Sequence, residues 1–179
     1  MSISIFCEVY MKTTTQKIIF SSMLAALTCV ATMVIKIPSP LNGYINLGDC
    51  IVLLSGWLLS PVYGFFAAGL GSALADLFSG YAAYAPATFL IKGLMALIAC
   101  GGVKLFQKRV DKQFSRIISG VTAELFMIAG YWLFEGFLYG FISSAVNIPA
   151  NGLQGLAGLI LGILLIHIFE KHKIMTMEQ

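Results

Sequence analysis

The sequence has very little charge. Charged residues make up 11% of its 179 residues, whereas 59% are hydrophobic, and the mean hydropathy is +0.90. A soluble domain carries roughly 25% charged residues, so this chain has too few to cover a surface that faces water. The alternating polar and apolar segments of a membrane β-barrel are also missing. The composition therefore predicts an all-α membrane protein, because a helix satisfies its own backbone polar groups within lipid.

Patterns that carry chemistry are equally scarce. The four cysteines are scattered, with no CxxC pair and no nearby histidine, so we interpret them as packing residues. The sequence contains no G-x-x-x-x-G-K-[ST] motif for ATP and no recognisable nucleophile–base pair. We therefore expect no catalytic residue, no cofactor, no metal and no nucleic-acid partner, and any ATP-driven process would need another subunit.

Long apolar runs, in contrast, are abundant. They predict a bundle of six transmembrane helices at about 18–37, 47–60, 62–78, 87–106, 117–141 and 150–169. The second is short for the roughly 20 residues that a bilayer crossing needs. Residues 12–173 are expected to form a single membrane domain, and residues 174–179 a cytoplasmic tail. Residues 1–11 are expected to be a flexible tail, with Met11 as an alternative start.

The basic residues predict the orientation of the bundle. Cytoplasmic loops of membrane proteins carry an excess of lysine and arginine. With both termini in the cytoplasm, nine of the 11 such residues fall on the cytoplasmic side: Lys12, Lys17, Lys104, Lys108, Arg109, Lys112, Arg116, Lys171 and Lys173.

Ionisable residues within spans are costly and are candidates for function. Asp49, Asp76, Lys92 and Glu135 are predicted in the outer half of the bilayer or at its edge, and Glu124 lies deeper. Four acidic residues accompany one basic residue. A pocket of this kind suits a neutral or weakly basic solute with hydrogen-bond donors, and it suits a phosphate or a dicarboxylate poorly.

Helical spacing brings polar side chains onto common faces. Glu124, Tyr131 and Glu135 are spaced i, i+7, i+11, which places them on one side of a helix. Asn147, Asn151 and Gln154 share a face of the sixth helix in the same way. Two such stripes at similar depth predict a shared pocket. Aromatic rings that could stack on a flat ligand there are Tyr81, Tyr84, Tyr131, Trp132 and Tyr139.

Structural roles remain open for several of these residues. Asp76 and Lys92 could neutralise each other, and Asp49 and Asn147 could cap helices. Trp132 and Tyr139 could belong to the aromatic belt at the membrane surface. Glu124 and Glu135 could make hydrogen bonds between helices. In the first helix, the pairs Ser22/Ala26 and Ala25/Cys29 are small residues four apart, which could serve internal packing or docking of a partner.

The segment from Tyr44 to Ala99 carries a resemblance. Its motifs INLGD, LLSPVYG, GSALADLFSGY and YAPATFLIKG, followed later by GYWLFEGFLYG and NIPANGLQG, resemble the substrate-binding S components of energy-coupling factor (ECF) vitamin transporters. The riboflavin/hydroxymethylpyrimidine-type branch is the most similar.

This resemblance implies a six-helix protein of the bacterial plasma membrane with both termini in the cytoplasm. Such a protein binds a vitamin or precursor near its outer face and works with an ECF coupling transmembrane subunit and two ATPase subunits. It implies docking through Ser22 and Ala26, where the family usually has two alanines. The candidate ligand contacts are Tyr44, Asn46, Asp49, Lys92, Glu124, Tyr131, Glu135, Asn151 and Gln154.

We rank pyridoxine-like or hydroxymethylpyrimidine-like ligands first, riboflavin second and a queuosine precursor third. Two other functions remain as alternatives. One is a self-sufficient secondary transporter or channel, and the other is an intramembrane enzyme that uses Asp76, Glu124 or Glu135 as acid or base.

Overall fold

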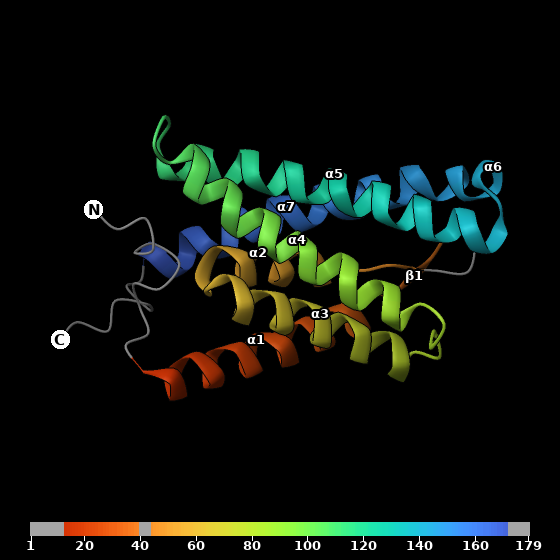
Figure 1. Cartoon of the computed structure of the whole chain (residues 1–179), viewed down its shortest axis with the longest axis horizontal. Helices are drawn as coiled ribbons and strands as arrows, with labels where there is room; N and C mark the ends of the chain where they lie inside the picture. Colours follow the sequence, from red (N-terminus) through yellow and green to blue (C-terminus); the bar gives the residue numbers. More distant parts are fainter. Residues whose placement is uncertain (1–12, 40–43, 172–179) are drawn as a thin grey trace.

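The computed structural model describes residues 13–39 and 44–171, which form a bundle of helices packed side by side (Figure 1). The predicted tails, residues 1–11 and 174–179, and the alternative start at Met11 lie outside the described residues. The elements in chain order are α1 (Thr14–Val34), β1 (Ile37–Pro38), β2 (Tyr44–Ile45), α2 (Gly48–Leu58), α3 (Pro61–Phe78), α4 (Ala85–Phe106), α5 (Lys112–Tyr139), α6 (Phe141–Ser144), the 3-10 helix η1 (Ala145–Asn147) and α7 (Ile148–Lys171).

Local sequence explains where several helices begin and end. Thr13 and Gln16 form a capping box at the start of α1, and Pro61 occupies the first position of α3, where its missing N–H costs nothing. The Asp111 side chain accepts hydrogen bonds from the backbone N–H groups of Gln113 and Phe114 and so caps α5. Gly140 ends α5 with a φ of 90°, a conformation that glycine adopts readily.

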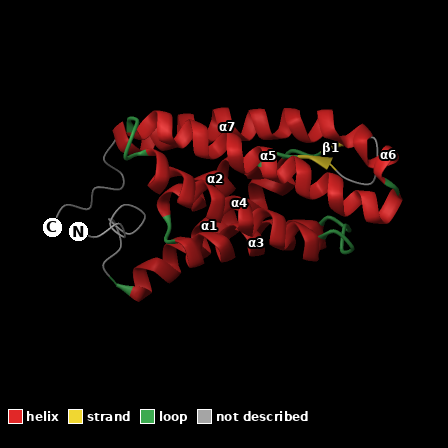
Figure 2. Cartoon of the chain, turned by 45° about the horizontal axis from the view of Figure 1, so that its top comes forward, coloured by secondary structure: helices red, strands yellow, loops and turns green. Residues whose placement is uncertain are grey.

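Two helices form the centre of the bundle. Helices α2 and α4 lie between a layer of α1 and α3 and a layer of α5 and α7 (Figure 2). Nine of the 11 residues of α2 are buried, and Leu53, Leu54 and Trp57 pack against α4, α5 and α7 in the main hydrophobic core. In contrast, α1 exposes Ile18, Ile19, Met23, Leu27, Val30 and Val34 on its outer side.

Five helical segments are long and apolar enough to cross a membrane: α1, α3, α4, α5 and the continuous stretch Phe141–Lys171. Together with the hydropathy of the chain, they make this a multi-pass, all-α membrane protein. The predicted second span is the 11-residue helix α2, which is about 17 Å long against a hydrocarbon core of about 30 Å. The prediction of six full spans is therefore not confirmed.

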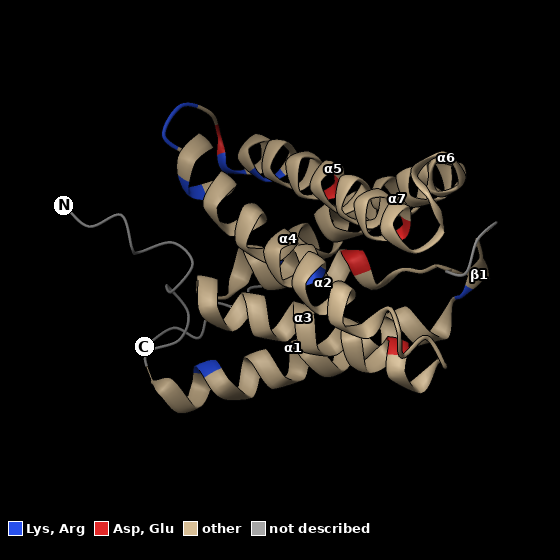
Figure 3. Ribbon diagram, turned by 45° about the vertical axis from the view of Figure 1, so that its right-hand side comes forward, with Lys and Arg blue, Asp and Glu red and all other residues tan. Residues whose placement is uncertain are grey.

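The two ends of the bundle differ in charge. One end, here called the basic end, holds the start of α1, the α4–α5 turn and the end of α7 (Figure 1). Most lysines and arginines gather there (Figure 3). At this end Arg116 Nη2 lies 2.8 Å from Glu170 Oε1, which joins α5 to α7. The prediction that the basic end faces the cytoplasm fits this arrangement and stays a prediction.

The opposite end, here called the pocket end, holds elements that the hydropathy pattern did not predict. Ile37 and Pro38 pair with Ile45 and Tyr44 in a short antiparallel hairpin. The first helix stops at Val34, three residues before the predicted end at residue 37, and the chain is extended from Ile35. Proline disfavours helix in the residue before it, which fits strand pairing of Ile37–Pro38. Helix α6 and η1 occupy most of the predicted loop 142–149.

Candidate ligand-binding pocket

A pocket with about 420 Å³ of empty space lies at the pocket end between the hairpin and helices α3, α4, α5 and α7. Segments distant in sequence meet there, because α2 and α4 bring the two outer layers together (Figure 2). Of the nine predicted ligand contacts, six line it: Tyr44, Asn46, Tyr131, Glu135, Asn151 and Gln154. The other lining residues are Ser39, Asp76, Tyr81, Tyr84, Thr88 and Asn147.

Asp76 from α3 is one of two carboxylates in the wall. The Tyr44 hydroxyl donates a 2.7 Å hydrogen bond to Asp76 Oδ1. Burial raises the pKa of the Tyr44 phenol, and the bond to Asp76 raises it further. Tyr44 therefore stays a hydrogen-bond donor in the physiological pH range and holds Asp76 in place in the wall.

Glu135 from α5 is the second carboxylate. The Asn147 amide Nδ2 lies 3.0 Å from both Glu135 oxygens, and both side chains are at most 3% exposed. Asn147 thus contacts Glu135 directly, and its alternative role as a cap of the sixth helix stays a prediction. Neither Asp76 nor Glu135 has a lysine or arginine within ion-pair distance among the described residues.

Gln154 forms the floor of the pocket and connects it to the bundle interior. Its Oε1 accepts hydrogen bonds from the backbone N–H of Asn46, at 2.9 Å, and from Asn46 Nδ2, at 3.2 Å. Its Nε2 donates a 2.8 Å hydrogen bond to Asp49 Oδ2. Asn46 Oδ1 in turn accepts a hydrogen bond from the backbone N–H of Gly48. Asn46, and not Asp49, therefore binds a backbone N–H group at the start of α2 that has no partner within the helix.

The other three predicted contacts, Asp49, Lys92 and Glu124, lie outside the pocket wall. Lys92 forms a buried ion pair with Asp49 beneath Gln154. The sequence left open a pair between Lys92 and Asp76, and the structure shows that Asp49 is the partner. Since Asp49 is fully buried and Lys92 is 3% exposed, the pair neutralises two charges that would otherwise be isolated within the bundle.

Glu124 lies deeper on α5. It is 5% exposed, and neither carboxylate oxygen has a hydrogen-bond partner among the described residues. Its side chain fits against Gly155 and Gly158 of α7, where an added Cβ would lie 2.9 Å from Glu124 Oε2 and 3.2 Å from Glu124 Oε1, respectively. The alternative of a structural hydrogen bond for Glu124 is therefore not supported.

Aromatic rings form much of the remaining wall. The rings of Tyr44 and Tyr81 lie 5.0 Å apart, and those of Tyr81 and Tyr84 lie 6.3 Å apart. The Tyr84 hydroxyl is buried near Tyr139 and Glu135 and makes no hydrogen bond of good geometry to a described residue. The Tyr131 hydroxyl makes a 3.1 Å hydrogen bond with Thr88 Oγ1.

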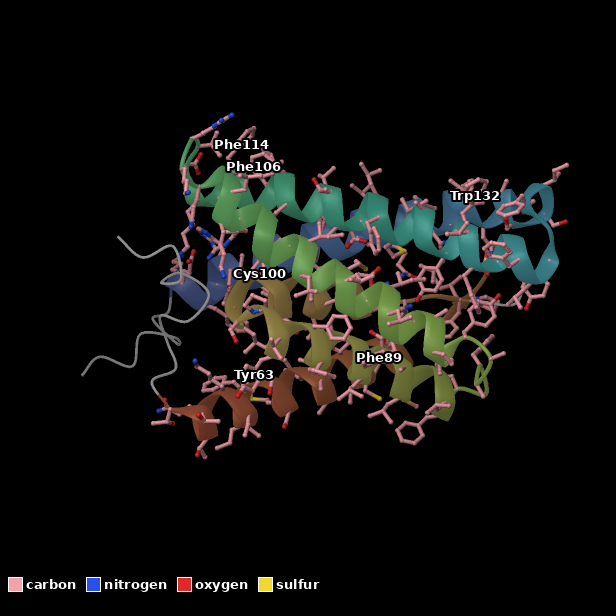
Figure 4. The ribbon with its side chains drawn as sticks, in the orientation of Figure 1. Tyr63, Phe89, Cys100, Phe106, Phe114 and Trp132 are labelled. Atoms are coloured by element: carbon pink, nitrogen blue, oxygen red, sulfur yellow. The ribbon has the colours of Figure 1, made fainter. Side chains whose placement is uncertain are left out.

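Trp132 and Tyr139 are not part of the wall. Trp132 lies on the outer side of α5 (Figure 4) and is 37% exposed. Its indole N–H donates to the carbonyl of Phe141 at 3.2 Å. Trp132 thus has an apolar body outside the bundle and a polar contact near the helix end, as an aromatic belt residue does.

Sequence reasoning did not select several wall residues as ligand contacts. Asp76 was recognised as an ionisable residue within a span, and its partner Tyr44 could not be identified from spacing because 32 residues separate the two. Thr88 carries no signal that distinguishes it from other threonines in apolar helices. Ser39 follows the first predicted span, in a segment to which the apolar pattern assigned no helix.

The fold and the site together define a class of protein: a multi-pass helical membrane protein with a recessed polar pocket at one end. Residues 12–171 match the family described as "ECF-type riboflavin transporter, S component". A Pyrococcus woesei protein described as "Uncharacterized protein in gap 3'region" is 36% identical over 144 residues, which is 79% of this chain and 93% of that protein.

A solved structure shares the fold. Its description is "Structure and mechanism of the S component of a bacterial ECF transporter", and it superposes with a TM-score of 0.73 at 26% identity, covering 89% of this chain and 98% of the other. This chain belongs to the family of ECF-type riboflavin transporter S components, and it is a substrate-binding S component of an ECF transporter. The family is one of transporter components and not of enzymes, and the resemblance inferred from the sequence is confirmed.

Proposed function

We propose that this protein captures a small heteroaromatic vitamin or vitamin precursor, neutral or weakly basic, in the pocket described above. The observation that carries the proposal is the chemistry of the wall. It contains two carboxylates without ion-pair partners, four tyrosines and four amide side chains, while none of the described lining residues is a lysine, arginine or histidine. Such a wall attracts donors and positive charge, and it repels a phosphate.

The acidic, amide-rich wall favours a weakly basic heteroaromatic ring with hydrogen-bond donors. A pyridoxine-like or hydroxymethylpyrimidine-like compound therefore remains the first candidate. Riboflavin is the second and is favoured by the description of the family. A queuosine precursor is the third.

A binding screen tests this proposal. Pyridoxine, hydroxymethylpyrimidine and riboflavin, together with pyridoxal phosphate, are titrated into purified, ligand-depleted protein by calorimetry and thermal shift. We expect micromolar or tighter binding of one unphosphorylated compound and no binding of the phosphorylated one. Tight binding of riboflavin without binding of either single-ring compound would refute the ranking of these candidates. Absence of any hit would refute the ligand class.

Variants in the wall connect binding to this pocket. Glu135→Gln and Asp76→Asn each replace a carboxyl group by a neutral amide and are expected to weaken binding of a basic ligand at least tenfold. Trp132→Phe is the matched control, since Trp132 is on the same helix, three residues before Glu135, and lies outside the wall. Trp132→Phe is expected to bind the ligand as tightly as the wild type does. An equal loss of ligand affinity in all three variants would point to misfolding.

For transport, the protein is proposed to act in the plasma membrane with an ECF coupling transmembrane subunit and two ATPase subunits, with the basic end in the cytoplasm. Uptake by cells is expected only when the coupling subunits are co-expressed. Uptake into vesicles by this chain alone, without ATP, would instead establish the alternative of a self-sufficient transporter.

Ser22 and Ala26 on α1 are proposed to dock the coupling subunit. Both are exposed on the outer side of α1, one helical turn apart. The other small pair of α1 is used internally, because a Cβ added to Gly71 of α3 would lie 2.4 Å from the Ala25 carbonyl oxygen. Ala26→Leu is expected to reduce co-purification of the coupling subunit without changing ligand affinity. Unchanged co-purification would refute this assignment.

A further inference from the structure

Glu124 is a buried titratable group that the pocket does not use. It lies in the middle of α5, eleven residues before Glu135, which corresponds to about 16 Å along the helix. Buried polar atoms in proteins are nearly always hydrogen-bonded, yet both Glu124 oxygens lack a partner among the described residues. An exception of this kind calls for a physical explanation.

The charged neighbours of Glu124 come from two other helices. Asp49 of α2 and Lys92 of α4 interact with it electrostatically, and Cys50 of α2 is a further titratable neighbour. Helix α7 places Gly155 and Gly158 against the Glu124 side chain, and a Cβ added to Gly158 would touch both the Asp49 side chain and Glu124 Oε1. Two carboxyl groups thus share the surroundings of one ammonium group.

The ammonium group is already engaged. Lys92 pairs with Asp49, and Asp49 Oδ2 also accepts from Gln154. If Glu124 were ionised as well, the group of three would carry one net negative charge deep within the bundle. An isolated buried charge costs far more than a buried neutral group, and the cheapest way to avoid it is to keep a proton on the carboxyl.

We propose that Glu124 is a proton-binding site within the helix bundle, occupied at neutral pH and controlled by the neighbouring Asp49–Lys92 ion pair. The protonated side chain makes the three-residue group neutral and explains why Lys92 turns to Asp49. Any change that releases Lys92 from Asp49 would bring its positive charge to Glu124 and drive the proton off. This site is independent of the ligand pocket and of the identity of the ligand.

Infrared spectroscopy of the ligand-free protein in lipid tests the proposal directly, because a protonated carboxyl has a C=O stretching band that a carboxylate lacks. The difference spectrum between wild type and Glu124→Gln at pH 7 is expected to contain one such band. The matched control is Glu170→Gln at the basic end. Glu170 bonds to Arg116 and Lys112, so its loss is expected to leave the protonated-carboxyl region unchanged.

A second variant keeps the test sound if Glu124→Gln folds poorly. Asp49→Asn frees Lys92 for Glu124, and the Glu124 band is expected to decrease or vanish at pH 7 although Glu124 itself is unchanged. A wild-type spectrum without a band assignable to Glu124 would overturn the proton site. A band that persists at full strength in Asp49→Asn would overturn its control by the ion pair.

Stability supplies an independent readout. Between pH 6 and pH 9 the melting temperature of the wild type is expected to fall relative to that of Glu124→Gln, since loss of the proton leaves a buried, unpaired charge while glutamine cannot ionise. If the melting temperatures of the two proteins changed in parallel over this pH range, the assignment of a proton to Glu124 would be contradicted.

Discussion

Replacing Lys92 with methionine should be among the most damaging single changes to the bundle. Methionine is unbranched and similar in length to lysine but carries no charge, so it fills the space that the lysine side chain leaves. The change leaves Asp49, which is fully buried, with Gln154 as its one remaining side-chain hydrogen-bond donor among the described residues. Removing one partner of a buried ion pair typically costs about 3–5 kcal/mol, because the other charge stays buried without compensation.

The expected change in melting temperature follows from the size of the chain. For proteins of 150–250 residues, 1 kcal/mol corresponds to about 2–4 °C, so Lys92→Met should melt roughly 6–20 °C below the wild type. Tryptophan fluorescence at a fixed heating rate is a suitable assay, because Trp57 lies in the main core and is 4% exposed. Lys108→Met is the control, since Lys108 is exposed in the α4–α5 turn, and it should melt within about 1 °C of the wild type.

The double variant Asp49→Asn/Lys92→Met separates charge from packing. The asparagine Oδ1 can still accept from Gln154, and no charge remains. Replacing both members of a buried pair by neutral groups is often close to neutral, so the double variant should recover at least half of the loss. The reasoning is refuted if Lys92→Met melts like the wild type, or if the double variant is no more stable than the single one.

The remaining predictions concern packing and the basic end. Gly158→Ala places a Cβ 2.6 Å from the Asp49 Cβ, so α2 and α7 must separate, and the melting temperature and ligand affinity should both fall. The control is Gly152→Ala on the same helix, whose Cβ meets no atom within 4 Å. It should be as stable as the wild type or slightly more so. Equal behaviour of the two variants in a thermal melt would argue against this close approach. Glu170→Gln removes the partner of Arg116, which is 4% exposed, and should lower stability by about 1–2 kcal/mol. Lys112→Met should cost under about 0.5 kcal/mol, because the Lys112–Glu170 pair is over one-third exposed. A larger loss of stability in Lys112→Met than in Glu170→Gln would contradict the view that Arg116 is the more important partner of Glu170. Tyr44→Phe removes the hydrogen-bond donor to Asp76 and should weaken ligand binding severalfold in calorimetry. The melting temperature should change by no more than about 4 °C. Unchanged affinity would exclude this hydrogen bond from ligand recognition.

Much of the fold could be predicted because lipid imposes simple rules. Apolar runs located α3 and α4 to within two residues at each end, since proline and charge mark those boundaries. The hairpin and α6 escaped prediction because their short segments carry no hydrophobic period long enough to identify. Whether α2 crosses the membrane depends on packing around it, which the sequence does not encode locally.

The candidate pocket was predictable where helical geometry alone decides. Tyr131 with Glu135, and Asn151 with Gln154, lie on common helix faces, and the structure places all four in the wall. The ion-pair partner of Lys92 could not be identified from the sequence, because only the packing of α2 against α4 brings Asp49 into contact with it. Glu124 shares the face of Glu135 but lies three turns deeper, so a shared face does not ensure a shared cavity.

The unequal lengths of α2 and α3 have a consequence for how a solute arrives. The two helices have 11 and 18 residues and are joined by a two-residue turn, so they run back along each other. At 1.5 Å per residue, the start of α2 lies about 10 Å short of the level where α3 ends. The chain between β2 and α2, which includes Asn46, thus runs from the pocket end into the interior of the bundle (Figure 1). An incoming molecule must shed most of its hydration water before it reaches the amides at the bottom, which favours compact, sparingly hydrated compounds over strongly hydrated ions.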